Sequence, residues 1–384
     1  MKFHFLIFGS LLGSLASAEQ LPGCCPPNAM DAPCDRCREH KDHYGMLRSA
    51  RPCQKEQCFP CSFGGQVDLS FLMWQAREDG LGFAIKNNPR LVPAPNLAAD
   101  VNGSMKTIHF SWEPAFKLNF EMDFSNSWDF DARWTFFYTR SSASSHAQTN
   151  ASTGSGLLPI WVLPQSYHAS PNVFGQARGI WHLHLNAADL ELGYHPFFTP
   201  KLNLRLYCGL KGISVSQQFS ANYSGGIDDG AVTLLPSRAA FRNRCLGLGP
   251  RFGINSEWSL KKGWSLLADG AVSMSLSVFN LSRKDFDNSV TDNGLTHYDD
   301  QSKFRESFYA YRPSIEGLIG IGWSDCLGCR QQYDIHLKAA YEVQYYWDQN
   351  MMRQLTAEPI SFTPFSMRGD LHLHGITTTL GFGF

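Results

Sequence analysis

The most constraining feature of this sequence is a strict alternation of apolar and polar residues over unusually long segments. Apolar residues occupy every second position from Phe116 to Phe124, and polar residues stand between them. After the short turn 125–127 the same alternation continues from Trp128 to Tyr138, with Phe137 as its one interruption. Because successive side chains of a strand point to opposite faces, this pattern predicts a β-hairpin with one apolar face.

The same pattern recurs along the chain, at 202–210, in the pair 246–258 and 264–278, and in the pair 315–323 and 333–347. Strands of soluble domains usually have ~5–6 residues, whereas a tilted membrane-crossing strand needs ~9–11. These runs are therefore long enough to cross a bilayer. A soluble antiparallel sheet with one buried face is the alternative that the alternation alone leaves open.

Aromatic residues flank the short turns and the end of the last predicted strand. Rings at matched heights beside each turn would form an interfacial girdle at one end of a barrel, since amphipathic rings settle at the lipid headgroups. The predicted girdle residues are Phe124, Trp128, Trp258, Trp264, Trp323, Tyr333, Phe382 and Phe384. A soluble sandwich gives no reason for this placement.

Composition and loop lengths agree with a membrane barrel. Charged residues make up 17% of the chain and aromatic residues 13%, and the net charge is only −1, which gives no reason to expect nucleic acid binding. The sequence has no run of 18 apolar residues after its N-terminus, so a transmembrane helix is not expected. Long polar loops are expected at 140–156, 216–244 and 280–307, and alternating short turns and long loops are typical of outer-membrane barrels.

We therefore predict an all-β fold: a transmembrane antiparallel β-barrel of about twelve strands, within a range of about 10 to 16, with a cysteine-rich N-terminal segment. An even strand number would place both ends of the chain in the periplasm. The stretch 156–165 could add a further strand. The expected strands are 66–77, 81–86, 105–112, 115–124, 128–139, 181–194, 201–215, 246–258, 264–279, 311–323, 333–347 and 370–384.

The two ends of the chain suggest export and insertion. A positive start, a short apolar run and Ala16-Ser17-Ala18 before Glu19 predict a signal peptide over residues 1–18, although Leu21–Cys24 loosely resembles a lipoprotein cleavage box. At the other end, Ile376, Thr378, Leu380, Phe382 and Phe384 share one face. That strand resembles the C-terminal signal by which outer-membrane barrels are delivered to their insertion machinery; the alternative is a soluble domain that ends in Phe-Gly-Phe.

Residues 19–63 form a predicted cysteine-rich periplasmic segment, followed by the barrel at 64–384. Two Cys-x-x-Cys pairs in this segment have the spacing of a zinc site, but export to an oxidising compartment favours disulfides. The chain has 11 cysteines, so at least one is unpaired or joined to another chain. The disulfide candidates are Cys24, Cys25, Cys34, Cys37, Cys53, Cys58, Cys61, Cys326 and Cys329.

No catalytic motif was found: the sequence has no Gly-x-Ser-x-Gly, His-Glu-x-x-His or phosphate loop. His182 with His184, and His372 with His374, place two imidazoles on one strand face, which is more often a polar face than a metal site. We expect no cofactor, no metal and no catalytic residue. If the apolar faces meet lipid, the alternate residues line the lumen. The pore-lining candidates are Lys117, Glu121, Asp129, Asp131, Arg133, Arg205, Lys211, Arg251, Glu257, Asp269, Lys338 and Glu342.

Four motifs that occur in order also carry a family resemblance: Phe71-Leu-Met-Trp-Gln-Ala-Arg-Glu-Asp-Gly-Leu81, Asp189-Leu-Glu-Leu-Gly193, Gly247-Leu-Gly-Pro-Arg-Phe-Gly253 and Tyr341-Glu-Val-Gln-Tyr-Tyr-Trp347. Over about residues 65–384 the chain resembles the pore-forming outer-membrane proteins of Legionella, a family that includes major-outer-membrane-protein-like porins of chlamydia-related bacteria. The resemblance implies a porin without catalytic residues. The dense cysteines resemble the disulfide-crosslinked envelopes of chlamydia-like organisms.

These observations favour an outer-membrane porin for ions and small hydrophilic solutes that is crosslinked to the envelope. The alternative is a non-conducting structural or adhesin barrel with binding loops; an outer-membrane hydrolase is a third reading, for which no nucleophile is evident. The expected partners are outer-membrane lipid, the barrel-insertion machinery and other cysteine-rich envelope proteins. A homo-oligomer is compatible with the pattern.

Overall fold

The computed structural model describes residues 64–88, 101–124, 127–150, 154–161, 173–196, 201–227, 233–234, 236–289, 298–327, 333–358, 361–366 and 369–384. These residues belong to one compact unit. The predicted signal peptide and the cysteine-rich segment 19–63 lie outside the described residues.

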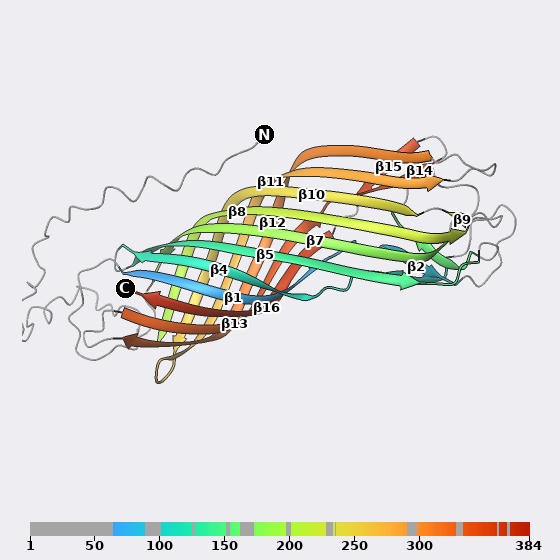
Figure 1. Ribbon diagram of the computed structural model, residues 1–384. Helices are drawn as coiled ribbons and strands as arrows, with labels where there is room; N and C mark the ends of the chain where they lie inside the picture. Colours follow the sequence, from blue (N-terminus) through green and yellow to red (C-terminus); the bar gives the residue numbers. More distant parts are fainter. Residues whose placement is uncertain are drawn as a thin grey trace, which may run out of the picture. The chain divides into compact units, whose positions relative to one another are not determined.

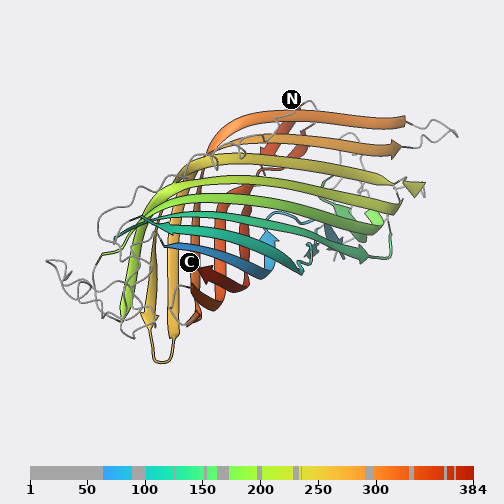
Figure 2. The ribbon, with the colours of Figure 1, turned by 60° about the vertical axis from the view of Figure 1, so that its left-hand side comes forward.

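Ten antiparallel strands form a closed barrel (Figure 1). They are β1 (Gly65–Glu78), β4 (Trp112–Asp123), β5 (Trp128–His146), β7 (Val173–Tyr194), β8 (Leu202–Ile227), β10 (Ser237–Ser259), β11 (Trp264–Ser289), β12 (Tyr298–Leu327), β13 (Tyr333–Asn350) and β16 (Gly369–Gly383). Their order around the barrel is β7-β5-β4-β1-β16-β13-β12-β11-β10-β8, and β8 pairs with β7 to close it. Figure 2 shows the long strands curving side by side.

Six short strands lie outside this ring. They are β2 (Ala84–Asn87), β3 (Gly103–Lys106), β6 (Gly156–Pro159), β9 (Thr233–Leu234), β14 (Arg353–Glu358) and β15 (Ser361–Ser366). β2 pairs with β3 and β6, and β6 touches β7 through one residue pair, Leu157 with Phe174. In Figure 1, β2, β9, β14 and β15 lie at the end of the barrel opposite the C-terminus.

The two ends of the barrel differ. At one end, which we call the turn end, short connections join β4 to β5, β7 to β8, β10 to β11 and β12 to β13. The first and last strands also meet there, because the amide of Gly65 donates to the Phe384 carbonyl at 2.9 Å and the reverse bond is 2.8 Å. We call the opposite end, where the longer connections join the strands, the far end. The halves of the barrel next to these ends are the turn-end half and the far half.

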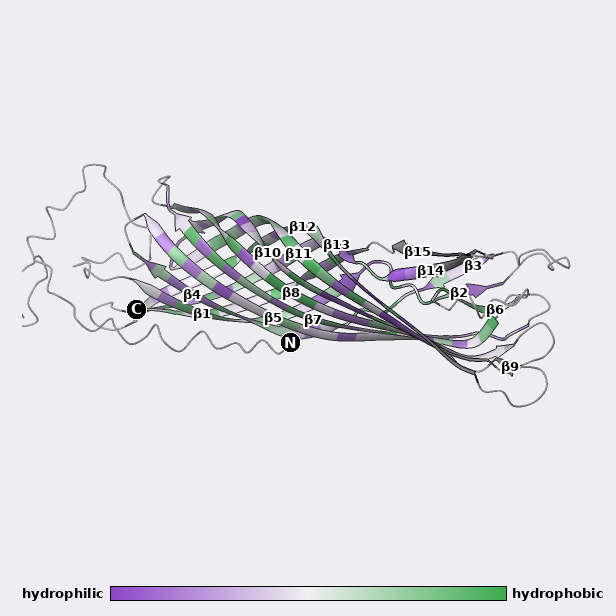
Figure 3. Cartoon of the chain, turned by 90° about the horizontal axis from the view of Figure 1, so that it is seen from above, coloured by the Kyte–Doolittle hydropathy of each residue, from purple (hydrophilic) through white to green (hydrophobic). Residues whose placement is uncertain are grey.

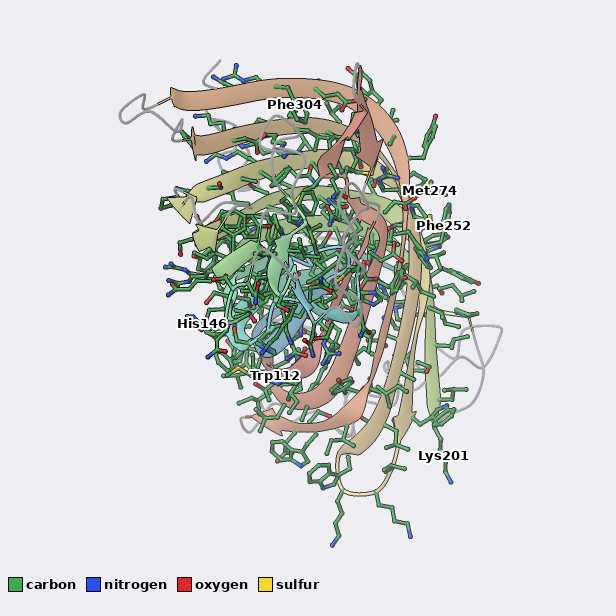
Figure 4. The ribbon with its side chains drawn as sticks, turned by 90° about the vertical axis from the view of Figure 1, so that its right-hand side faces the viewer. Trp112, His146, Lys201, Phe252, Met274 and Phe304 are labelled. Atoms are coloured by element: carbon green, nitrogen blue, oxygen red, sulfur yellow. The ribbon has the colours of Figure 1, made fainter. Side chains whose placement is uncertain are left out.

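The outer face of the turn-end half is an apolar band. On β11 the outward side chains from Trp264 to Leu276 are almost all apolar, and Val272 is 52% exposed. Figure 4 shows Phe252 and Met274 on the outer side of the wall. Seven of the predicted girdle residues are exposed and Trp323 is half-buried; Trp264 pairs with Trp323 across strands. In the described part of the chain, no helix is long and apolar enough to span a membrane.

The polarity of both faces reverses halfway along the strands. On β8 the outward residues change from Leu206 and Leu210 to Ser214, Gln218 and Asn222 towards the far end. The inward residues change in the opposite sense, from charged to apolar. On β8 they run from Arg205 and Lys211 to Ile213, Val215, Phe219, Ala221 and Tyr223. Figure 3 shows hydrophilic and hydrophobic residues alternating along these strands. A wet outer face over an apolar interior is the pattern of a soluble barrel, so the far half lies outside the lipid.

The structure confirms the fold class and corrects its details. Ten of the twelve expected strands are barrel strands; the segments 81–86 and 105–112 instead hold the short strands β2 and β3, which are not part of the ring. Within the stretch 156–165, the described residues 156–161 hold β6. The expected loops 216–244 and 280–307 are mostly strand, and the expected loop 140–156 is partly strand. These segments were predicted as loops because their outward residues are polar. The alternation continues there, but the many polar residues give the segments the composition of a loop.

The polarity reversal predicts different responses to charge on the two halves of one strand. Val272→Arg should lower the free energy of unfolding by about 2–4 kcal/mol, because it places a cation in the lipid-facing band. Asn280→Arg, on the same outer face of β11 beyond the band, should change it by less than about 0.5 kcal/mol. Denaturant titration in lipid vesicles measures both; equal losses would contradict the placement of the membrane.

Candidate functional site

The barrel interior is the candidate functional site, and it has two layers. We call the charged layer within the turn-end half the ion-pair layer, and the aromatic and aliphatic layer within the far half the apolar layer. The inward residues of β7 illustrate both: Glu191 and Asp189 lie in the first layer, and Leu185, Leu183 and Trp181 lie in the second.

The ion-pair layer is centred on two arginines. Arg205 on β8 donates to both carboxylate oxygens of Asp129 on β5, the shortest bond being 2.7 Å, and to Glu191 on β7 at 3.0 Å. His195 at the β7–β8 turn contacts the same aspartate at 2.8 Å. Asp129 and Glu191 are essentially inaccessible to solvent. These bonds join three neighbouring strands at the turn end.

The second arginine extends the network across the lumen. Arg251 on β10 donates to Glu191 at 2.9 Å and to Glu316 on β12 at 2.7 Å. Lys211 on β8 also contacts Glu316, at 2.7 Å, and contacts Asp189 at 3.2 Å. Each cation therefore faces two carboxylates, and the charges in the layer are largely neutralised by one another.

Further polar contacts connect walls that are distant in the ring. Lys117 on β4 donates to both carboxylate oxygens of Glu342 on β13, at 2.8 and 2.9 Å, across the two intervening strands β1 and β16. The amide of Gln217 on β8 donates to Glu78 on β1 at 2.8 Å, although three strands separate them on the shorter side of the ring. Side chains thus span the lumen from wall to wall.

The apolar layer fills much of the far half with buried side chains. Inward rings of the wall meet rings carried by the segments that hold β2, β3 and β6. Trp161 packs against Phe219 and Phe241 with centroid distances of 5.7 and 4.7 Å, and Phe110 packs edge-on against Trp181 at 5.5 Å. Trp161 and Trp181 have no exposed surface. Such packing excludes water from between these rings.

Buried hydrogen bonds fix the segments that hold β2, β3 and β6, which we call the inserted segments. The hydroxyl of Tyr223 on β8 donates to the Phe83 carbonyl at 2.5 Å, and the Trp161 indole donates to the Gly82 carbonyl at 2.5 Å. The Asn87 amide donates to the Gly154 carbonyl at 3.0 Å, which joins the two inserted segments. The segments are therefore fixed to the wall as well as packed against it.

All twelve pore-lining candidates have side chains that are buried or half-buried, and none is exposed. Nine of them form ion pairs in the ion-pair layer. Six pair with one another: Lys117, Asp129, Asp131, Arg133, Arg205 and Glu342. Lys211, Arg251 and Lys338 pair with other acids. Sequence reasoning missed their partners Asp68, Asp189, Glu191, Glu316 and His336. The same period-two alternation would have found them, since each stands between outward residues.

The other predicted sites fall outside this interior. The side chains of the nine disulfide candidates lie outside the described residues; of the described cysteines, Cys208 is exposed and Cys245 is buried, and both are free thiols. His182 and His184 lie beside Tyr138 on the outer face. In the described part of the chain, one group of three potential metal ligands occurs within 4.8 Å: Asp79, Asp370 and His372.

The sequence as a whole decides the family. The model of the family described as Legionella pneumophila major outer membrane protein precursor matches residues 59–382. The chain belongs to this family. It is therefore an outer-membrane barrel protein, and both layers of its interior lie within the matched region. No curated protein sequence matches the chain.

The similar solved structures are distant from this chain. The outer membrane protease OmpT from Escherichia coli is 12% identical, with 84% of this chain and 98% of that chain covered and a TM-score of 0.40. The Pseudomonas putida toluene transporter TodX is 8% identical, with 85% and 90% covered and a TM-score of 0.24. A Pseudomonas aeruginosa FadL homologue is 7% identical, with 84% and 90% covered and a TM-score of 0.24. These likenesses are too distant to carry an activity to this family member.

The ion-pair layer predicts a strong penalty for breaking one pair. Lys117→Met leaves the Glu342 carboxylate buried without its cation and should lower the free energy of unfolding by about 3–5 kcal/mol. The double variant Lys117→Met/Glu342→Met should recover most of that loss, because no unpaired charge remains. Denaturant titration of both refolded proteins measures the effect; an unaffected single variant would mean that the pair faces bulk water.

Proposed function

We propose that this protein is a structural barrel of the outer membrane, closed to free diffusion of solutes, that holds its longer connections on a rigid support outside the lipid. The observation that carries the proposal is the apolar layer, in which Trp161, Trp181 and Phe219 are almost completely buried across the far half of the lumen. A diffusion pore needs a continuous aqueous path from one end to the other.

The ion-pair layer supports the same conclusion. Arg251, Lys211 and Glu191 have at most 2% of their surface exposed, and each is committed to opposite charges of the wall. Charges that attract permeating ions must instead be accessible to water. A barrel of about eight strands has an interior just wide enough for its side chains, and a ten-stranded barrel is only slightly wider.

The far half gives the barrel its surface role. β11 runs on to Ser289 and β12 begins at Tyr298, well beyond Val278, where the unbroken run of outward apolar residues of β11 ends. A plain membrane anchor needs only ~9–11 residues per strand, so this extension is additional structure. Its apolar interior stiffens it in the way a soluble core does, and it carries the far-end connections away from the bilayer.

Electrical recording tests the proposal. The protein purified from outer membranes should insert into planar bilayers without discrete current steps, while a sixteen-stranded porin in the same bilayers conducts. Insertion is checked by protection of the turn-end half from protease. Stepwise openings of the inserted protein, with a reversal potential under a salt gradient, would refute closure.

Those openings would support the second candidate, a porin for ions and small hydrophilic solutes. Mixed charges line the turn-end half of the lumen, and Lys338 keeps 35% of its side chain exposed. If this candidate is right, Lys338→Glu should shift the reversal potential towards cation selectivity, since it replaces an accessible cation in the path.

Crosslinking through the cysteine-rich segment is a separate part of the proposal. Eleven cysteines in an exported chain support disulfides to other envelope proteins. With thiols blocked at lysis, the protein should migrate as high-mass species that reductant converts to monomer. Replacing the seven cysteines between Cys24 and Cys61 with Ser should remove those species, and replacing Cys208 and Cys245 should not. Identical migration with and without reductant would exclude crosslinking.

A further inference from the structure

A patch of cations covers the outer face of three neighbouring strands just beyond the apolar band. All six side chains are exposed. This basic patch consists of Arg238, Arg242 and Arg244 on β10, Lys284 on β11, and Lys303 and Arg305 on β12. It is a surface feature that neither the interior nor the proposed closure of the barrel explains.

The strand register brings these cations into rows. Arg242 pairs with Ser282 on β11, and Ser282 pairs in turn with Arg305 on β12. Adjacent strands lie ~4.8 Å apart, so the backbones of the two arginines are roughly 10 Å apart on one face. In the same way, Lys284 pairs with Lys303 directly across the strands. Like charges directly opposite each other destabilise a sheet unless an anion lies between them.

No acid compensates this charge within the patch. The outward residues among the cations are Ala240, Asn280, Ser282, Phe286 and Ser307. In the part of the chain that the structure describes, none of the six cations forms an ion pair with a carboxylate, whereas the inward Arg283 of β11 is paired with Asp285 at 2.7 Å. The patch is therefore available to an external anion.

The position of the patch identifies that anion. The row of Leu246, Val278 and Tyr309 is the last apolar row of the band on these strands, and Tyr309 and Tyr311 are 73% and 69% exposed. Arg244 is the next outward residue of β10, which is ~7 Å further along the strand. Cations at this height face the headgroups of the leaflet that surrounds the barrel. Since longer connections are extracellular in such barrels, this is the outer leaflet.

We propose that the basic patch is a binding site for phosphorylated glycolipids of the outer leaflet. The guanidinium groups of Arg242 and Arg305 bind the phosphates on either side of Ser282, and the apolar row below holds the acyl chains. Arginine suits this role because its planar fork makes two parallel bonds to a phosphate. A soluble anion would not require a lipid-facing apolar surface directly beside the cations.

The opposite side of the barrel provides a matched control. There the outer face near the far end carries an acid as well as cations: Asp79, which directly follows β1, has 66% of its side chain exposed. Arg77 on β1 and Arg140 on β5 are exposed arginines away from the patch. Replacing them removes the same total charge without touching β10, β11 or β12.

Lipid retention tests the proposal. Full-length wild-type protein, Arg242→Gln/Arg305→Gln and Arg77→Gln/Arg140→Gln are reconstituted in phosphatidylcholine nanodiscs containing bisphosphorylated lipid A. Each is then extracted in mild detergent, and the lipid A retained per protein is measured by mass spectrometry. The patch variant should retain about thirtyfold less than wild type, the order expected for losing two cations at an anionic lipid surface, and the control variant should match wild type.

Two further arms distinguish the ligand. Dephosphorylated lipid A should not be retained by wild-type protein, and excess inorganic phosphate should not displace bound lipid A. Undiminished retention by the patch variant, or equal losses in both variants, would overturn the proposal. Displacement by inorganic phosphate would replace the lipid with a soluble anion and also overturn it. Unchanged circular dichroism of the variants establishes that all three proteins are folded.

Discussion

Backbone hydrogen bonding in lipid is the constraint on which this structure depends. A strand that crosses a bilayer has two edges of N–H and C=O groups, and no water is present in the hydrocarbon to satisfy them. The pairing of β7 with β8 removes the last two free edges of the ring. The pairing of β1 with β16 joins residues that are about 300 positions apart in the sequence, such as Gln66 and Gly383.

Closure then creates an interior that must be filled. Within the lipid-facing half the chain fills it with charges, which pair across the lumen as Arg251 does with Glu191 and Glu316. Beyond the lipid it fills the lumen with rings and with inserted segments bound to the wall. The two fillings follow from the outer solvent: where the outside is apolar the polar residues must point in, and where the outside is water the apolar residues must point in.

This rule explains which parts of the fold the sequence predicted. The strands around Phe116–Phe124 and Trp128–Tyr138 were recognisable because apolar residues alternate with charges over a long run. The far parts of β8 and β11 were mistaken for loops, since serine and asparagine occupy their outer positions. Alternation is present in both halves, but its sign reverses, and a search for strands with an apolar outer face ends at the reversal. The segments that hold β2 and β3 were predicted as barrel strands for another reason: their attachment to the wall depends on contacts such as that of Phe83 with Tyr223, which are remote in sequence.

By itself, the sequence determined that the chain forms long amphipathic strands, that rings flank its short turns, and that charged side chains face away from the lipid. These are local properties, because the period of a strand is set by the backbone. Only the tertiary structure decided that the charges neutralise one another, that the inserted segments pack against the inner wall of the far half, and that six cations on three strands form one patch. Each of these depends on strand register and ring closure, which bring Lys117 to Glu342 and Arg242 near Arg305, and no local pattern specifies such long-range pairings.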